Sequence, residues 1–210
     1  LDRFGFQPPK RIYNMYNQIR DLDLLTPPVL STAVTVGRAW DIMQEKKIST
    51  LPVANEDGTL HGMLSAGDVA NYDMLSVYDP VVSNVPVYNL LSVLEGRILN
   101  ESGHLRDEIS GKVVIALPTC REHLLFSDPN NIVVCGDQPD MIRRALELGV
   151  NCIIVCQAEV PQELLDTKQD TVIISTPYDC YQSVRLIWHA MPIAHVCKSE
   201  NLVYFHLDDY

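Results

Sequence analysis

The residues best suited to chemistry are Ser65 and Asp68, which follow the apolar run at residues 60–64. A serine three residues before an acid is typical of a helix capping box, in which each side chain bonds a backbone N–H of the first turn. The same groups have a second use. A hydroxyl and free N–H groups at a helix start can hold a phosphate, and a carboxylate one turn later can accept both hydroxyls of a ribose. The pair alone leaves both interpretations open.

The elements that position this pair are expected to form a β-α-β-β-α unit. We predict a strand at 34–36, a helix at 37–46, strands at 51–54 and 60–64, and a helix from 66 to about 72. Asp57-Gly58 between two apolar runs is a strong hairpin signal. The last helix then has Ser65 near its N-cap and Asp68 in its first turn.

The run AWDIMQEKKISTLPVANEDGTLHGMLSAGDVA presents these features in order: a helix, the strand ISTLPV, the turn EDG, the strand GMLS and the helix start S-x-x-D. Over residues 24–75 the chain resembles a cystathionine-β-synthase (CBS) domain. The resemblance implies an adenine nucleotide bound between paired CBS repeats, with Ser65 at a phosphate and Asp68 at the ribose. It also implies that the base and sugar are lined by Ser31, Thr32 and the segment 48–52, which contains Ser49, Thr50, Leu51 and Pro52. Lys47 is either a phosphate contact or a solvated helix-end lysine.

The second half of the sequence has a different pattern. Short, almost continuous apolar runs at 113–117, 132–135, 152–156 and 172–175 indicate strands of a parallel sheet covered by helices. An amphipathic helix is predicted from the stripe of Val87, Leu90, Leu91, Leu94 and Ile98. Asp137 is expected to cap a helix that ends at Gly149, and Thr176 to cap the next helix.

Polar residues follow three of these strands, at the edge where open α/β sheets bind ligands. They are Gly136-Asp137-Gln138, Gln157-Ala158-Glu159 and Ser175-Thr176. Helix caps explain most of them, and a ligand site is the alternative.

The segments VVCGDQPDMIRRALELGVNCIIV and ISTPYDCYQSVRLIWHAMPIAHV, within residues 132–210, resemble a DRTGG domain. Gln138 departs from that pattern where a basic residue is expected, and Cys156-Gln157-Ala158 stands in place of Thr-Gly-Gly. The predicted fold class is α/β, a CBS-type β-α-β-β-α unit followed by a DRTGG-type open, mainly parallel α/β sheet. We expect a lead-in at 1–23, a CBS domain at 24–80, a DRTGG-like domain at 81–200 and the start of a possible second CBS repeat at 201–210.

This domain order is similar to the regulatory insert of CBS-containing family II inorganic pyrophosphatases, and LDRFGFQPPKRI resembles the stretch that leads into that insert. The resemblance implies inhibition by AMP and ADP, and activation by ATP or diadenosine polyphosphates in some members. It also implies a homodimer and contact with a separate Mn- or Co-dependent catalytic domain of the parent chain, an inorganic diphosphatase. The fragment itself is expected to be neither catalytic nor metal-binding, since none of its histidines lies in an acid-rich metal motif.

Three alternatives remain open at the level of sequence. The first is that the chain is a nucleotide-sensing module of another protein, such as a phosphate acetyltransferase, transporter or dehydrogenase. The second is that its α/β half is an interaction or dimerisation scaffold without a ligand. The third is an enzyme that uses Asp137, Gln157 and Ser175, although no nucleophile and base pair stands out.

Composition narrows the class of protein further. A net charge of −11 opposes nonspecific binding to nucleic acid, which requires Lys and Arg to neutralise phosphates. No apolar run approaches the roughly 20 residues that span a bilayer, and no secretory signal is evident, so we expect a cytoplasmic protein. The six cysteines lack C-x-x-C spacing and are expected to be reduced thiols, with Cys120 and His123 as at most half of a zinc site. A first residue other than Met suggests an excised fragment.

Overall fold

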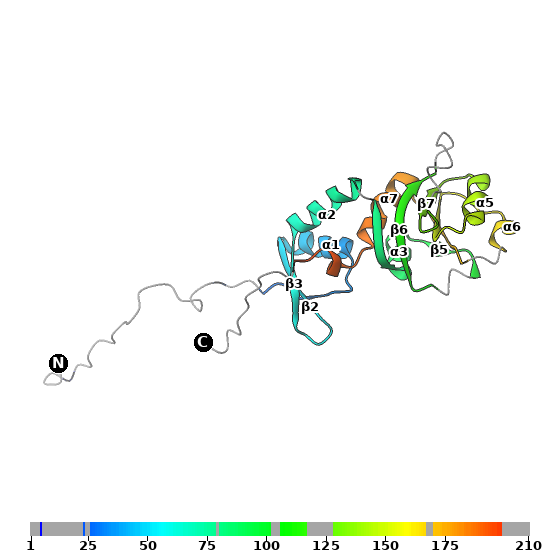
Figure 1. Cartoon of the computed structure of the whole chain (residues 1–210). Coiled ribbons are helices and arrows are strands. Elements are labelled where there is room, and N and C mark those ends of the chain that lie inside the picture. Colours follow the sequence, from blue (N-terminus) through cyan, green and yellow to red (C-terminus); the bar gives the residue numbers. More distant parts are fainter. Residues whose placement is uncertain are drawn as a thin grey trace.

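The computed structural model describes residues 5, 23, 26–78, 80–101, 106–116, 128–166 and 170–198. They form two units, which lie side by side in Figure 1. The N-terminal unit, residues 30–78, contains β1 (Leu30–Ser31), α1 (Val36–Lys46), β2 (Thr50–Ala54), β3 (Leu60–Ser65) and α2 (Ala66–Tyr78). The α/β unit, residues 81–189, follows it in the chain. This is the predicted α/β class, a small mixed sheet followed by an open, mainly parallel one.

The N-terminal sheet has the order β1-β2-β3, with β1 parallel and β3 antiparallel to β2. The predicted hairpin is confirmed. In its turn, Oδ1 of Asp57 accepts hydrogen bonds from the backbone N–H and the hydroxyl of Thr59, and Gly58 has a left-handed φ of +82°. Leu51, Val53 and Leu64 are completely buried. Since side chains alternate along a strand, their neighbours in β2 and β3 lie on the opposite, open face of the sheet.

Two boundaries in this unit differ from the sequence prediction. The first strand is Leu30–Ser31 and not residues 34–36, because Thr35 is the N-cap of α1 and its hydroxyl accepts from the N–H of Arg38 at 3.2 Å. Val36 is therefore helical and buried. At the other end of the unit, α2 continues to Tyr78 instead of stopping near residue 72.

The sheet of the α/β unit has the strand order β4-β6-β7-β8-β9-β5. Its central strands, β6 (Glu108–Ile115), β7 (Ile132–Cys135), β8 (Cys152–Cys156) and β9 (Val172–Thr176), are parallel, as predicted from their apolar runs. The edge strands β4 (Val81–Pro86) and β5 (Arg97–Ile98) are antiparallel to their neighbours. The sheet is therefore mainly, but not wholly, parallel.

Helices cover both faces of this sheet. One apolar cluster joins α5 (Pro139–Glu147) and α6 (Gln162–Leu165) to the side of the sheet that carries Val133, Ile153 and Ile173. A second cluster joins α3 (Val87–Val93) and α7 (Cys180–His189) to the alternate residues, among them Val134 and Ile154. This division follows from the two-residue period of a strand, and it explains why the strands are apolar on both faces.

Four local predictions in the α/β unit are wrong. Ile98 does not extend the amphipathic helix, because α3 ends at Val93 and Ile98 lies in β5. The strand expected at 113–117 begins earlier, at Glu108. Gln138, not Asp137, is the N-cap of α5, without a side-chain cap bond. Thr176 belongs to β9, and α7 is capped by Asp179 instead, which accepts from the N–H of Gln182 at 2.8 Å. The predicted left-handed stop at Gly149 is confirmed, with φ +64°.

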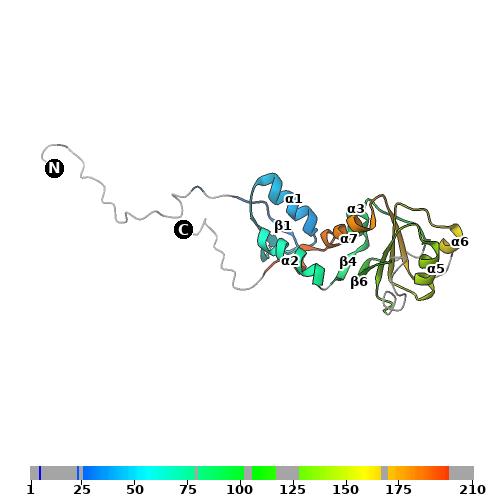
Figure 2. The same ribbon diagram turned by 90° about the horizontal axis from the view of Figure 1, so that it is seen from above.

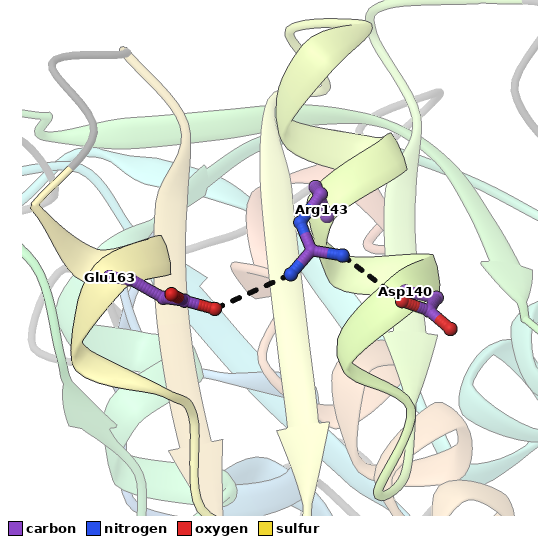
Figure 3. A network of polar contacts seen from close by, with 3 residues as sticks. All are labelled: Asp140, Arg143 and Glu163. Atoms are coloured by element: carbon purple, nitrogen blue, oxygen red, sulfur yellow. Dashed lines mark hydrogen bonds and ion pairs between the residues drawn. The ribbon is translucent and has the colours of Figure 1, made fainter.

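A charged network on the surface connects α5 to α6 (Figure 3). Arg143 lies between Asp140, at 3.1 Å, and Glu163, at 3.4 Å. The side chains are 48%, 96% and 71% exposed, respectively. Exposed pairs contribute about 0 to 1 kcal/mol, so burial of the apolar cluster, rather than this network, holds the two helices on the sheet.

Helix α7 joins the two units. In Figure 2 it lies beside α3, at the end of the α/β unit nearest to α1 and α2. The rings of Tyr72 and Trp188 meet edge to face with centroids 6.1 Å apart, and Nη2 of Arg185 lies 2.8 Å from Oδ2 of Asp73. Ile187 and Trp188 are buried in the apolar cluster that also contains Leu30 and Met43. The two units therefore share one core.

Five of the cysteines are described, and all five are free thiols, as predicted: Cys135, Cys152, Cys156, Cys180 and Cys197. Burial raises the pKa of Cys135, Cys152 and Cys156 to about 12, so these thiols are protonated at neutral pH. Cys120 and His123 lie outside the described residues. Within the described ranges, no helix is long and apolar enough to cross a membrane, and no cluster of three or more His, Cys, Asp or Glu could hold a metal ion.

Gly111 in β6 is required by a close approach of the backbone. A Cβ at this position would lie 1.6 Å from the carbonyl oxygen of Asn130, and φ is +155°. We expect Gly111→Ala to lower the free energy of unfolding by about 3 kcal/mol or more, measured by urea denaturation. Gly136→Ala is the control, since its Cβ would have no neighbour closer than 4.0 Å. Equal denaturation midpoints for the two variants would contradict the assignment.

Candidate functional site

Ser65 and Asp68 form a complete capping box at the start of α2. Oδ2 of Asp68 accepts from the N–H of Ser65 at 3.0 Å and from its hydroxyl at 2.6 Å, and the N–H of Asp68 donates to Oγ of Ser65 at 3.1 Å. The N–H of Ala66 donates to the carbonyl of Ser49 at 2.8 Å, which fixes the end of β3 beside the start of β2. The pair has the structural role expected from its spacing, and it lies where three elements meet.

The other carboxylate oxygen of Asp68 has a partner from a distant part of the chain. Nζ of Lys198 lies 2.7 Å from Oδ1 of Asp68. The Asp68 side chain is only 9% exposed, whereas that of Lys198 is 77% exposed. Burial raises the pKa of Asp68, but the hydrogen bonds from Lys198 and Ser65, together with the charge of Lys198, more than offset this and leave the pKa below its usual 3.8. Asp68 is a buried anion at neutral pH.

The open face of the N-terminal sheet continues this site. Thr50 is directly opposite Ser65 in the β2-β3 ladder, and Pro52 is opposite Met63. Opposed residues of an antiparallel pair point to the same side of the sheet. Thr50, Pro52 and Ser65 therefore share the face that the helices leave uncovered, next to Asp68.

The remaining predicted site residues are Leu51, Ser31, Thr32 and Lys47. Leu51 points into the core and is completely buried, so only its backbone is available to a ligand. Ser31 pairs with Ala54, and the N–H of Thr32 donates to the carbonyl of Ala54 at 3.3 Å. Both lie at the far end of β2 from Thr50, about 13 Å away along the strand. Lys47 is the exposed C-cap of α1, with a left-handed φ of 55°.

Sequence reasoning missed Lys198. No local pattern marks this residue, because it is 130 positions from Asp68 and reaches it only through the path of the chain after α7. A pairing of residues 192–198 with the N-terminal sheet would have been the signal, and single-sequence patterns do not encode it.

Some of the polar residues predicted at the carboxyl edge of the large sheet line one cleft. A cleft of about 530 Å³ is lined by Gln157–Glu159, Ser175–Pro177, Glu95 and Arg97. Thr176 donates its hydroxyl to the carbonyl of Leu94 at 2.6 Å, and the Gln157 amide donates to the carbonyl of Pro177 at 3.1 Å. These bonds connect neighbouring loops. Thr176 and Gln157 therefore have structural roles at this edge of the sheet.

A smaller cavity of about 280 Å³ lies at the joint of the two units, between α1, α2 and α7. Trp40, Tyr72, Trp188 and Arg185 are among its lining residues. Its walls are mainly aromatic and aliphatic, which does not suit a phosphate. The groups that suit a nucleotide are those around Ser65 and Asp68.

Comparison with known proteins agrees with this arrangement. The CBS domain family matches residues 19–75, and the DRTGG domain family matches residues 89–190. The chain contains a CBS domain and a DRTGG domain. Ser65 and Asp68 lie in the CBS domain, and α7 belongs to the DRTGG domain.

The CBS–DRTGG chain also resembles a characterised regulatory region. It is 29% identical, over 218 aligned residues, to the cobalt-dependent inorganic pyrophosphatase of Clostridium perfringens, an alignment that covers 100% of the chain and 39% of that protein. The chain therefore spans well under half of that relative's length. A crystal structure of the CBS and DRTGG domains of the regulatory region of C. perfringens pyrophosphatase, complexed with the activator diadenosine tetraphosphate, has a TM-score of 0.71 and 26% identity. That match covers 90% of this chain and 84% of the other.

Asp68 gives the CBS domain a pH-dependent contribution to stability. Because its pKa is lowered on folding, the stabilisation is present above the unfolded value of 3.8 and is lost as the pH falls through the folded pKa. We expect Asp68→Asn to lower the free energy of unfolding by about 1 kcal/mol at pH 7, and by progressively less below pH 3.8.

Chemical denaturation at pH 7, 5 and 3 measures this difference. Glu56→Gln is the control, since it removes an exposed acid of the turn between β2 and β3 and should change the free energy of unfolding by less than about 0.5 kcal/mol. A difference between wild type and Asp68→Asn that stays constant from pH 7 to pH 3 would contradict the assignment.

Proposed function

We propose that this chain is the adenine-nucleotide-sensing region of a family II inorganic pyrophosphatase, and that it binds AMP, ADP, ATP or a diadenosine polyphosphate at Ser65 and Asp68. The observation that carries the proposal is the buried carboxylate of Asp68 beside the Ser65 hydroxyl on an open sheet face. The similar C. perfringens region, crystallised with diadenosine tetraphosphate, supports the class of ligand.

The proposed binding mode uses each group for one part of the nucleotide. The Ser65 hydroxyl, once it turns from Asp68, would donate to a phosphate, aided by the positive end of the α2 dipole. The Asp68 carboxylate would accept the two ribose hydroxyls. Ser49, Thr50 and Pro52 would border the sugar, and Ser31 and Thr32 the far end of the ligand. Lys47 would approach the phosphate.

A complete site is proposed to need a second CBS repeat, whose start we assign to residues 201–210. A micromolar dissociation constant corresponds to about −8 kcal/mol, so a half-site with half of that free energy binds at about millimolar concentration. A homodimer of the chain would supply further contacts in the same way.

The proposed role is control of a separate catalytic domain that hydrolyses pyrophosphate with Mn or Co. AMP and ADP would inhibit it, and ATP or diadenosine polyphosphates would activate it. Such control requires each nucleotide to bind two arrangements of the paired CBS domains with different affinity, since a ligand shifts an equilibrium only by that difference.

Calorimetric titration of the chain with AMP, ATP and diadenosine tetraphosphate tests the proposal. We expect saturable binding of at least one of the three nucleotides. In Asp68→Ala the affinity should fall about tenfold or more, because the ribose loses its hydrogen-bonded anion.

Glu56→Ala is the matched control, since Glu56 is exposed in the hairpin turn and its loss should leave the affinity unchanged. No heat for any nucleotide up to several millimolar, with an unchanged melting temperature, would refute the proposal and favour a ligand-free scaffold.

A further inference from the structure

The chain that leaves the DRTGG domain returns to the CBS domain and binds to it through its backbone. The N–H of Ile193 donates to the carbonyl of Val34 at 2.8 Å. Further along, Met63 and Lys198 exchange two N–H···O bonds of 3.1 Å each, as an antiparallel bridge. The segment 192–198 therefore begins beside the residues that follow β1 and reaches the edge strand β3 at Lys198.

Gly62 permits this close approach. A Cβ at Gly62 would lie 2.7 Å from the carbonyl oxygen of Lys198, closer than real Cβ contacts occur. Any side chain at this position would therefore push the segment away from β3. The docking depends on a specific residue of the CBS domain, and it places Lys198 on the same side of the sheet as Met63.

The ammonium of Lys198 occupies one of the hydrogen-bond acceptor positions of Asp68 that a ribose would need. A carboxylate has about four lone-pair positions. In Asp68, two of them accept from Ser65 through Oδ2, and a third accepts from Lys198 through Oδ1. Two ribose hydroxyls need two positions, so at least one existing contact has to open.

When the ribose arrives without a phosphate for the Ser65 hydroxyl to bind, Lys198 is the contact that opens more easily. The Ser65 bonds cap α2 and join residues three apart, so breaking them also weakens the helix start. The Lys198 side chain is 77% exposed and gains full hydration when it leaves. Solvent around the exposed lysine also screens the attraction between the two charges.

We infer that Lys198 is a competing counter-ion of the nucleotide site. It neutralises Asp68 while the site is empty and is displaced when a ribose binds. This inference rests on the proposed function, since it assumes that Asp68 binds the ribose.

Adenosine is the probe that isolates this competition. It carries the ribose hydroxyls but no phosphate, so long-range attraction between a phosphate and the lysine does not contribute. Lys198→Met keeps an unbranched side chain of similar length and removes the charge. We expect this variant to bind adenosine about two- to fivefold more tightly than wild type, the factor that corresponds to an ion pair screened by solvent on its lysine side.

Salt provides a second readout that a merely structural lysine would not affect. Screening weakens the Lys198–Asp68 pair, so wild-type affinity for neutral adenosine should rise between about 0.05 and 0.5 M NaCl. The affinity of Lys198→Met should change much less over the same range. Lys112→Met, an exposed lysine of β6, is the matched control and should behave as wild type.

Calorimetry of the three proteins with adenosine, AMP and diadenosine tetraphosphate separates the outcomes. Tighter, salt-insensitive binding of adenosine by Lys198→Met alone supports the inference. Equal or weaker binding of adenosine by that variant, with wild type still binding nucleotides, overturns the role of Lys198 and leaves the proposed function intact. No binding of any of the three ligands by any of the proteins overturns both.

Discussion

The structure depends on the burial of α7, which packs against α1 of the CBS domain on one side and against α3 and the large sheet on the other. Ile187 and Trp188 belong to one apolar cluster that includes Leu30 and Met43 of the CBS domain and Val134 and Ile154 of the DRTGG sheet. Removing apolar surface from water contributes about 25 cal/mol per Å², so the two domains are stabilised together rather than separately. The Asp73–Arg185 pair helps to orient α2 relative to α7 at this joint. It contributes little free energy, because both side chains are partly exposed.

This shared core determines where the chain can go after α7. Met191 and Ile193 are still buried in it, and from there the backbone passes Val34 and reaches β3. The position of Lys198 beside Asp68 is therefore a consequence of packing some distance away. Access to the open face of the CBS sheet and the path of the chain out of the DRTGG domain are linked through a few backbone hydrogen bonds.

Local sequence patterns predicted the parts of the fold that local forces determine. The Asp57-Gly58 hairpin, the four central strands of the large sheet, the capping pair at Ser65 and the helix stop at Gly149 all follow from turn chemistry, apolar periodicity or backbone conformation. The errors occur where two local solutions compete. Thr176 and Asp179 are both good N-caps, and only the pairing of β9 with β8 decides that Thr176 remains in the strand.

The candidate site was predictable to the same extent. Ser65, Asp68 and Thr50 lie together because the hairpin register brings them together, and that register follows from the turn. Ser31 and Thr32 were placed by resemblance, and the parallel pairing of β1 puts them at the far end of β2. Lys198 required the three-dimensional path of the chain, which periodicity and spacing do not contain.

The cavity at the joint has a consequence for observing this protein. The chain contains two tryptophans, and both Trp40 and Trp188 line that cavity, one on each domain. Trp40 is 38% exposed, whereas Trp188 is buried against Tyr72. Tryptophan fluorescence therefore reports the contact between the CBS and DRTGG domains and not the sheet face that carries Asp68. A change in emission on adding a nucleotide would show, without any label attached to the protein, that binding at the sheet face alters the joint between the domains.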